Sequence, residues 1–386
     1  TSSQWVTKTS ATTIAGTTVY YSNSAYPVNN ISELYTINYY DDYSFDNDGL
    51  TVPGTTAYST TITTVKGLAT GSKVKVLGTS NWITSVTGYD QHRRAVWSAS
   101  KNNYLGTTDI IESELQPMTA WLTKSKTTHK KTGKTDIVTI DTFTYDHSGK
   151  LLTHNQKINS HPEQSIAVNE YDALGQLVRK KVGGVTGGTT LQVVDYTYNI
   201  RGWLKGINDV NNLGSTDLFG FKLSYNDPSD ITKALFNGNI SQSEWKTASI
   251  NPAPYNPVSN KYTYTYDALN RITTAMDNTG NYDEFGITYD KNGNILNLQR
   301  DGKTHPTNNT FGLMDNLTYT YANNNTSNKL IKVEDGSTST EGFKNGANTA
   351  TEYTYDVNGN MLTDANKGIT NITYNYLNLP VQISMT

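Results

Sequence analysis

The residue types that usually do chemistry are few and scattered in this chain. Its histidines lack the i, i+4 or paired spacing that metal ligation favours, so we expect surface or hairpin positions for all of them. Cysteine is absent, which excludes thiolate nucleophiles, thiolate metal sites and disulfides. Neither a Gly-x-Ser-x-Gly elbow nor a phosphate-binding loop is present. We therefore predict no catalytic, cofactor-binding or metal residues, and not an enzyme. The histidines are His92, His129, His147, His154, His161 and His305.

One acidic segment faintly resembles a calcium loop. Asp46-Asn-Asp-Gly49 lies close to Asp41 and Asp42, but Thr55 stands where a bidentate Glu would close such a site. The sequence favours a turn capped by acidic side chains. The Asp-x-Asn-Gly-Asn turns further along are likewise explained by hairpin stabilisation without an ion.

The aromatic residues allow two interpretations. The chain has 27 Tyr, 8 Phe and 6 Trp, and aromatic faces can stack on sugar rings while Asn and Asp bind the hydroxyls. They can also pack against cross-strand neighbours and stiffen a sheet, which we favour. A glycosidase would need two carboxylates at a set separation, and the sequence does not show which of 34 acidic residues face each other. The tryptophans are Trp5, Trp82, Trp97, Trp121, Trp203 and Trp245.

Composition excludes several partners. Net charge is -3 and the pI about 6.1, so no electrostatic case exists for nucleic acid, and we expect Lys124 to Lys134 to be a solvated hairpin. No apolar run approaches the roughly 18 residues of a membrane span. The chain starts Thr1-Ser-Ser without a Met or leader, and we expect an internal piece of a longer protein. Only 35% of the 386 residues are hydrophobic, which suits half-wetted sheets rather than a thick core.

A repeat organises the chain, with the consensus Tyr-(Asp/Asn)-x-x-(Gly/Asn)-x-apolar. A degraded copy starts at Tyr89, weaker ones at Tyr225 and Tyr321, and a Pro-bearing variant runs from Tyr374 to Pro380. The predicted turn residues are Tyr145, Asp146 and Gly149; Tyr171, Asp172 and Gly175; Tyr198 and Gly202; Tyr266 and Asp267; Tyr289, Asp290 and Gly293; and Tyr355, Asp356 and Gly359.

Each part of the consensus has a mechanical role. Tyr262-Thr-Tyr264-Thr-Tyr266 places tyrosines on one face of a strand and threonines on the other, with the hydroxyls free to stay hydrated. The Asp accepts hydrogen bonds from turn N–H groups, and both residues of Asn292-Gly293 and of Asn358-Gly359 tolerate positive φ. The sequence therefore predicts a strand, a tight turn and a returning strand in each copy.

The spacing of the copies bears on architecture. The interval is 19 residues from Tyr355 to Tyr374 but 68 from Tyr198 to Tyr266, whereas a propeller needs a steady period of about 40 to 45. An all-β winding ribbon of hairpins is the better prediction. We expect one continuous architecture, with a divergent β-rich leading segment over 1–88 and the repeat segment over 89–386.

These motifs resemble the YD repeats of the Rhs family, which includes bacterial Rhs toxin shells, the C-component shells of Tc toxins and teneurin-like barrels. Phrases such as Val194-Asp-Tyr-Thr-Tyr-Asn-Ile-Arg-Gly-Trp-Leu204 and Tyr289-Asp-Lys-Asn-Gly-Asn294 look like the subtype of Bacteroidetes-like bacteria. The resemblance implies a spiralling β-ribbon that forms part of a large hollow shell, often around a variable C-terminal toxin. The family's self-cleavage residues match no position here, since Asp227-Pro228 lies inside the repeats, so any toxin would lie beyond Thr386.

Three functions follow as expectations. The first is an exported Rhs-type shell segment that encloses or presents a polymorphic effector outside this sequence. The second is a cell-surface adhesion or carbohydrate-binding module, and the third is a polysaccharide-active enzyme. The expected partners are the rest of its own longer chain with its toxin, and a secretion system or surface partner. We expect an exported, extracellular or cell-surface location and no cofactor.

Overall fold

The computed structural model describes residues 1–386 except 1–3, 64, 215–216 and 249–257, so the predicted chain start at Thr1 lies outside the described residues. The all-β prediction is confirmed, because nearly all regular structure is antiparallel strand. The chain forms two compact units, Thr1–Val194 and Asp195–Thr386. The predicted division at residues 88 and 89 falls at the end of one strand and stays a prediction. No helix in the described part is long and apolar enough to span a membrane.

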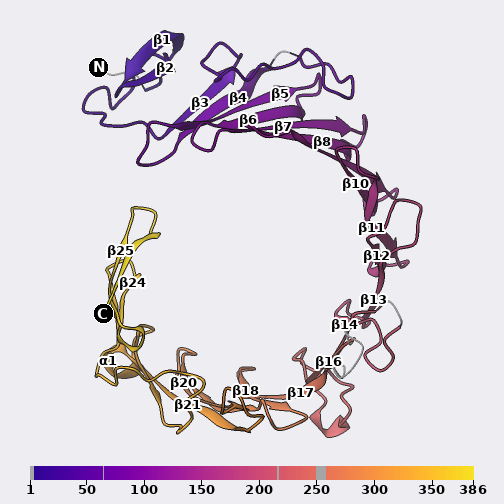
Figure 1. Ribbon diagram of the computed structural model, residues 1–386, viewed down its shortest axis with the longest axis vertical. Coiled ribbons are helices and arrows are strands. Elements are labelled where there is room, and N and C mark those ends of the chain that lie inside the picture. Colours follow the sequence, from indigo (N-terminus) through magenta and orange to yellow (C-terminus); the bar gives the residue numbers. More distant parts are fainter. Residues whose placement is uncertain (1–3, 64, 215–216, 249–257) are drawn as a thin grey trace. The chain divides into compact units, whose positions relative to one another are not determined.

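In the first unit every strand of the main sheet pairs antiparallel with the next one in sequence (Figure 1). A separate hairpin, β1 with β2, precedes this sheet. The strands are β1 (Lys8–Ile14), β2 (Thr17–Tyr21), β3 (Thr36–Asp41), β4 (Val65–Lys75), β5 (Trp82–Tyr89), β6 (Ala95–Asn102), β7 (Thr107–Leu115), β8 (Leu122–Lys131), β9 (Ile137–Tyr145), β10 (Leu151–Ile158), β11 (Gln164–Tyr171) and β12 (Leu177–Val182).

The second unit repeats this order, with β13 to β22 paired in succession and β23 to β26 as a further sheet. Its elements are β13 (Gln192–Tyr198), β14 (Leu204–Ile207), β15 (Phe219–Ser224), η1 (Ile231–Lys233), β16 (Gln242–Thr247), β17 (Ser259–Tyr266), β18 (Ile272–Asp277), β19 (Glu284–Tyr289), β20 (Ile295–Lys303), β21 (Phe311–Tyr321), α1 (Ala322–Asn325), β22 (Leu330–Asp335), β23 (Tyr353–Tyr355), β24 (Met361–Asp364), η2 (Ala365–Lys367), β25 (Ile369–Tyr374) and β26 (Pro380–Met385).

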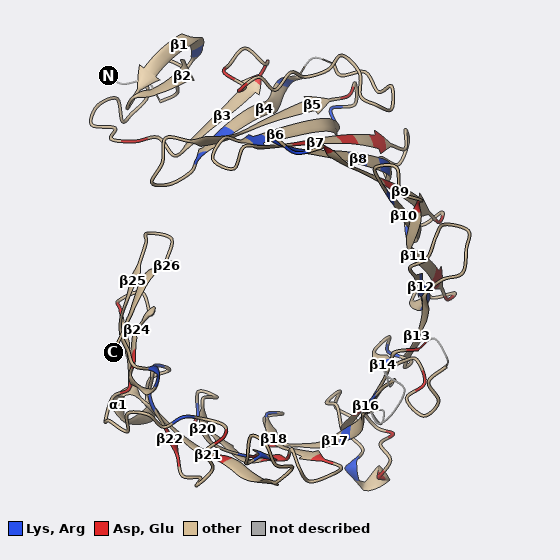
Figure 2. Ribbon diagram, viewed as in Figure 1, with Lys and Arg blue, Asp and Glu red and all other residues tan. Residues whose placement is uncertain are grey.

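The basic stretch Lys124 to Lys134 lies on β8 and its turn, beside acidic residues on β7 (Figure 2). Lys126 Nζ is 3.0 Å from Glu112, and Lys124 Nζ is 3.0 Å from Glu114 on the partner strand. Cross-strand pairs of opposite charge stabilise a sheet locally. Lys124 and Lys126 therefore form cross-strand ion pairs, whereas Lys130, Lys131 and Lys134 are exposed, which agrees with the expected solvated hairpin.

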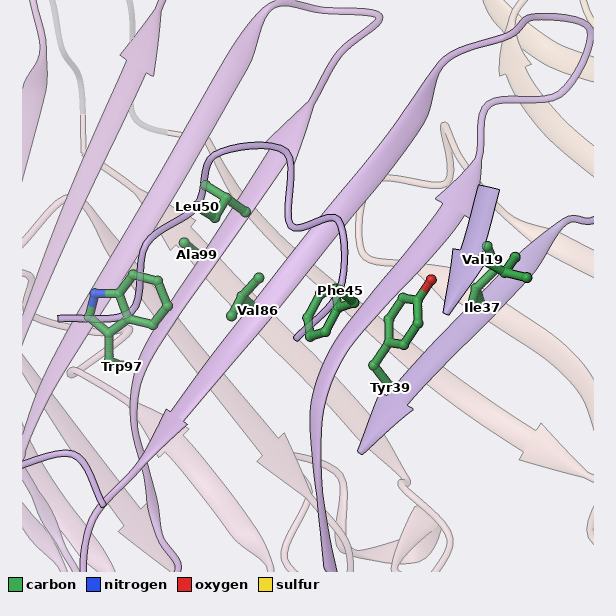
Figure 3. Packing of buried hydrophobic residues seen from close by; sticks show 8 residues of the cluster. All are labelled: Val19, Ile37, Tyr39, Phe45, Leu50, Val86, Trp97 and Ala99. Carbon is green, nitrogen blue, oxygen red and sulfur yellow. The ribbon is translucent and has the colours of Figure 1, made fainter. Parts of the chain in front are cut away.

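The main buried cluster of the first unit lies under the connection between β3 and β4 (Figure 3). Phe45 and Leu50 of this connection pack against Val86 and Trp97 of the sheet. Tyr39 is fully buried, and its ring stacks on Phe45 with centroids 4.2 Å apart. Burial raises the pKa of Tyr39 to about 12. The connection thus covers one face of the sheet and supplies the apolar burial that the sparse composition limits elsewhere.

Glycine makes room for this covering segment. A Cβ added at Gly71 would lie 2.2 Å from Cζ of Phe45, and one at Gly88 would lie 2.9 Å from Cδ1 of Ile62. Polar bonds fix the segment as well, because Tyr43 Oη donates to the carbonyl of Thr87 over 2.9 Å. The strands under the segment therefore need glycine for close approach, not for turn geometry.

We predict that Gly71→Ala destabilises the first unit by about 1 to 3 kcal/mol, because the new methyl group overlaps the Phe45 ring in a packed site. The measurement is the free energy of unfolding in urea. Gly54→Ala is the matched control, since a Cβ there meets nothing within 4 Å. Equal stability of the two variants would contradict this packing.

Candidate functional site

The repeated turn is the most regular constellation in the chain, and its positions are numbered 1 to 7 from Tyr145 to Leu151. The position 2 side chain organises it. Asp146 Oδ1 accepts the N–H groups of Ser148 and Lys150, over 2.8 and 2.9 Å. The same pair of bonds recurs at Asp90, Asp172, Asn199, Asp267, Asp290, Asp356 and Asn375. One side-chain oxygen thus satisfies two turn donors in each copy.

Position 5 explains the Gly or Asn of the consensus. Gly149, Gly293 and Asn270 have φ of 83°, 91° and 62°, in the left-handed region. In the Asn292-Gly293 pair only the glycine has positive φ, so the turn needs this tolerance at one of the two residues. The turn spans four residues and ends on the left-handed one, because the Asp146 carbonyl accepts from Gly149 N–H over 3.1 Å.

A β-bulge follows every turn of this kind. Tyr145 faces Leu151, whereas Thr144 faces Thr153, so Leu152 is an extra residue in the returning strand. The same shift occurs after the turns that end at Ala95, Leu177, Leu204, Ile272, Ile295, Met361 and Pro380. Bulges bend a strand and increase its local twist. The repeat therefore encodes a regular bend as well as a turn.

In several copies the position 1 tyrosine joins its hairpin to the one before it. Its hydroxyl donates to the main-chain carbonyl of position 7 in the preceding copy, for example Tyr171 to Leu151 over 2.9 Å and Tyr289 to Ile272 over 2.7 Å. Further examples are Tyr225 to Leu204 at 3.1 Å, Tyr321 to Ile295 at 3.0 Å and Tyr374 to Met361 at 2.7 Å. The hydroxyls expected to stay hydrated are thus satisfied by protein, while ring burial raises the pKa of Tyr289.

In three copies the residue at position 6, which the consensus leaves open, packs on the next tyrosine. The Arg271 guanidinium lies 4.5 Å from the Tyr289 ring centroid, and Lys150 Nζ lies 5.5 Å from that of Tyr171. Trp203 takes the same place, 5.2 Å from Tyr225. A cation or an indole on an aromatic face is favourable in either case. The sequence could have indicated this contact, because Lys150, Trp203 and Arg271 share one position of the repeat.

Where a threonine precedes the repeat tyrosine, its side chain often bonds to a residue of the returning strand. Thr144 Oγ1 lies 2.6 Å from Thr153 Oγ1, and Thr354 and Thr363 repeat the contact at 2.8 Å. In another copy Asn297 donates to Thr288 over 2.8 Å. Tyrosines and threonines therefore occupy opposite faces, as the alternation predicts, and both faces carry bonds between strands.

Sequence reasoning missed one turn altogether. Leu115 faces Leu122 across a turn in which Gln116 Oε1 accepts the N–H groups of Met118 and Thr119, over 3.0 and 2.7 Å. Its last carbonyl, at Leu122, accepts the Tyr145 hydroxyl over 2.8 Å. Glutamine replaces the aspartate, and leucine replaces the tyrosine. Only the following tyrosine, which needs an acceptor, could have indicated this copy.

The histidines are distributed over separate elements. His129 Nδ1 lies 2.6 Å from Asp109, and His154 Nε2 lies 2.7 Å from Asp141 while its ring stacks on Phe143. His147 occupies a turn position, and His92, His161 and His305 are on loops. No group of three or more His, Asp or Glu in the described part of the chain has the arrangement of a metal site.

The loop that resembles a calcium site holds a lysine. Lys73 Nζ is 2.7 Å from Asp46 Oδ2 and 3.5 Å from Asp48 Oδ2, and its side chain is 8% exposed. The hydrogen bond from Lys73 lowers the pKa of Asp46. The Lys101 ammonium donates to the carbonyl of Asp48 over 2.8 Å. Ammonium groups thus take the place that a divalent cation would need.

Asp301 has a raised carboxyl pKa, which is a property that catalytic carboxylates often share. Burial and the neighbouring Asp283 raise the pKa of Asp301. Asp283 is itself engaged, because its Oδ1 accepts the Asp277 N–H over 2.6 Å and its carbonyl accepts the Asp301 N–H over 2.8 Å. These acids close a hairpin end. The polysaccharide-active alternative therefore gains no carboxylate pair here.

The tryptophans mostly pack within the sheets. Trp97 is 5% exposed in the first unit, and Trp245 stacks on Tyr262 at 5.7 Å. Trp121 lies 5.4 Å from Tyr145. Trp5 is 69% exposed, and Trp82 and Trp203 are half-buried and line pockets. Most tryptophans thus support the packing interpretation. Sugar binding stays an alternative, because Trp82 and Trp203 line pockets.

Fold and site together define an antiparallel β-ribbon of interlocked repeat hairpins. No protein-family model matches the sequence, and no curated protein matches it. Among solved structures, the chain is similar to the Photorhabdus luminescens Tc holotoxin pore with a mutated TccC3, at 14% identity over 85% of this chain and a TM-score of 0.44. It is also similar to TcdB2-TccC3 without its hypervariable C-terminal region, at 14% identity over 77% of this chain and a TM-score of 0.36. The chain spans 17% of the length of each.

We predict that Tyr289→Phe lowers the free energy of unfolding by about 1 kcal/mol, because the Ile272 carbonyl loses its hydroxyl donor while the ring contacts remain. Tyr289→Leu loses the Arg271 contact as well and is expected to cost more. Denaturant unfolding measures both. Tyr104→Phe, at a residue 60% exposed, is the control and should leave stability unchanged. A Tyr289→Phe variant as stable as that control would refute a stabilising role for the bond between Tyr289 and Ile272.

We predict that the stability of the fold falls at acidic pH because the turn aspartates become protonated. The N–H of Lys150 lowers the pKa of Asp146, that of Arg271 lowers the pKa of Asp267, and the Asn360 amide lowers the pKa of Asp356. A depressed carboxyl pKa contributes stability that is present above the ordinary value of about 4 and is lost as pH falls through the folded value.

The triple variant Asp146→Asn, Asp267→Asn and Asp356→Asn should therefore lose less stability than the wild type between about pH 5 and pH 2. It should still fold at neutral pH, because Asn199 accepts the same two bonds over 2.9 and 3.0 Å. Urea unfolding at a series of pH values measures this, with Asp136→Asn outside the repeat turns as the control. Parallel curves for wild type and triple variant would rule the turns out as the source.

Proposed function

We propose that this chain is a segment of an exported Rhs-type β-shell, which encloses or presents an effector encoded elsewhere in the same protein. Its role in this proposal is structural and not catalytic. The observation that carries the proposal is the bond between neighbouring hairpins, in which the tyrosines of several copies donate to position 7 of the preceding copy. A joint made only with its neighbour can be repeated along a ribbon of any length.

The recurring bulge supports the same proposal. Each copy with the short turn adds one residue to the returning strand at the same place, and bulges bend and twist the strands that contain them. A ribbon that bends at every copy suits a curved wall better than a flat sheet. The resemblance of the motifs to YD repeats supplies the enclosed toxin and the export, which are proposals for this chain.

The wall itself is thin and polar enough for such a role. Each unit is built from strands in succession rather than from two facing sheets, and half-buried residues dominate the strands. A chain with 35% hydrophobic residues can still form this ribbon because hydroxyl and amide bonds join neighbouring strands. A wall of this kind presents large surfaces on both sides, which suits contact with a partner segment of the same protein.

The test is electron microscopy of the full-length natural protein. We expect the repeat ribbon to surround a cavity that holds another part of the chain, and a solid particle would refute the proposal. A second arm removes everything that follows residue 386 in that protein. A toxin carrier then loses killing activity, whereas an adhesion module retains binding to its surface partner and would replace our proposal.

A further inference from the structure

One repeat of the second unit has a greatly expanded turn. Tyr225 donates its hydroxyl to Leu204 in the usual way, and Tyr266 donates to Ile240 over 2.8 Å. Ile240 is therefore position 7 of the copy that begins at Tyr225. Residues 226–239 stand where the other copies have their short turn, and they include η1. Expanded loops on a regular scaffold commonly carry binding functions.

This insert and the preceding turn enclose a pocket of about 440 Å³. Tyr198, Trp203 and Tyr225 contribute rings from the repeat framework, and Leu235 and Phe236 contribute apolar surface from the insert. Phe236 is 75% exposed although it belongs to this wall. An exposed phenylalanine in a pocket with three framework aromatics provides a flat face for a ring-shaped ligand.

The charge of the pocket is one-sided. Arg201 and Lys205 line it, and no Asp or Glu is among the lining residues. Arg201 lies 5.1 Å from the Trp203 ring, which holds the guanidinium beside the opening. Lys205 pairs with Asp227 at the side. Position 2 of this turn is Asn199, so the carboxylate found in most copies is replaced by a neutral amide that can also donate.

The geometry points to a binding site for an acidic sugar residue, such as a uronic acid within a polysaccharide. The carboxylate would pair with Arg201, the apolar face of the ring would lie on Phe236, and the amides of Asn199 and Asn226 would bind hydroxyls. Charge complementarity selects an anionic ligand, and a planar guanidinium suits a carboxylate. The mixture of flat apolar walls with amides suits a sugar ring better than an extended peptide, which would need free backbone partners.

This site does not depend on the proposed shell. The chain could form a shell segment without binding sugar, and it could bind sugar without enclosing any cargo. The inference therefore stands or falls on binding measurements with the chain, whereas the shell proposal depends on the full-length particle. The two can fail independently.

The test is calorimetry and ligand-observed NMR on the full chain, with a tetrasaccharide of alternating glucuronic acid and N-acetylglucosamine as the probe. We expect saturable binding, at least about tenfold tighter than that of the neutral tetrasaccharide cellotetraose. Arg201→Gln and Phe236→Ala should each weaken binding by about tenfold or more. Both residues are exposed, so folding should persist, and circular dichroism checks this.

Lys291→Gln is the matched control, since it removes an exposed cation from another repeat turn, and it should bind like the wild type. Equal binding of the acidic and neutral sugars, or full binding by Arg201→Gln, would overturn the assignment. An acetylated Glu-Tyr-Glu peptide serves as a third ligand. Binding of that peptide through Arg201 without any binding of the sugar would also overturn it, in favour of an acidic peptide partner.

Discussion

The hydrogen bond from a tyrosine hydroxyl to a main-chain carbonyl of the preceding hairpin is the interaction on which this structure depends. It occurs where the carbonyl of position 7 lies beyond the regular ladder, as at Ile272, which accepts from Tyr289. An unsatisfied carbonyl there would cost about 1 to 3 kcal/mol. The same bond recurs in several copies, and it requires the hydroxyl of tyrosine, because phenylalanine would bury the same ring without a donor.

This joint explains how a chain of modest hydrophobicity can form extended sheets. Burial in the second unit is confined to small clusters such as Leu317, Val333 and Tyr353, and most strand residues are only half-buried. Side-chain bonds that recur at fixed repeat positions therefore supply part of what a thick core would supply. In the first unit the connection between β3 and β4 covers one sheet face, so that unit adds an apolar cluster to the same joints.

The sequence predicted the strands, the turns and the alternation of tyrosine and threonine because these depend on neighbours in the chain. It did not predict the acceptor of each tyrosine, since that carbonyl belongs to the preceding hairpin and a main-chain atom leaves no trace in an alignment. The Gln116 turn escaped detection for another reason, because its geometry persists without the consensus tyrosine or aspartate. The sequence also did not predict the ion pair of Lys73 with Asp46, because Lys73 lies on β4, far from Asp46 along the chain.

Redundancy within each turn explains why degraded copies still fold. Arg93 occupies position 5 with φ of 64°, a conformation that costs a residue with a side chain roughly 1 to 2 kcal/mol. Asp90 compensates by accepting two N–H groups and the Arg94 guanidinium, over 2.8, 2.9 and 2.7 Å. Arg94 also reaches the carbonyl of Gln116 in the next turn, at 3.3 Å. Since several bonds define each turn, single positions are free to change, and the expanded turn at Tyr225 shows how such freedom lets a repeat acquire a pocket while its joints persist.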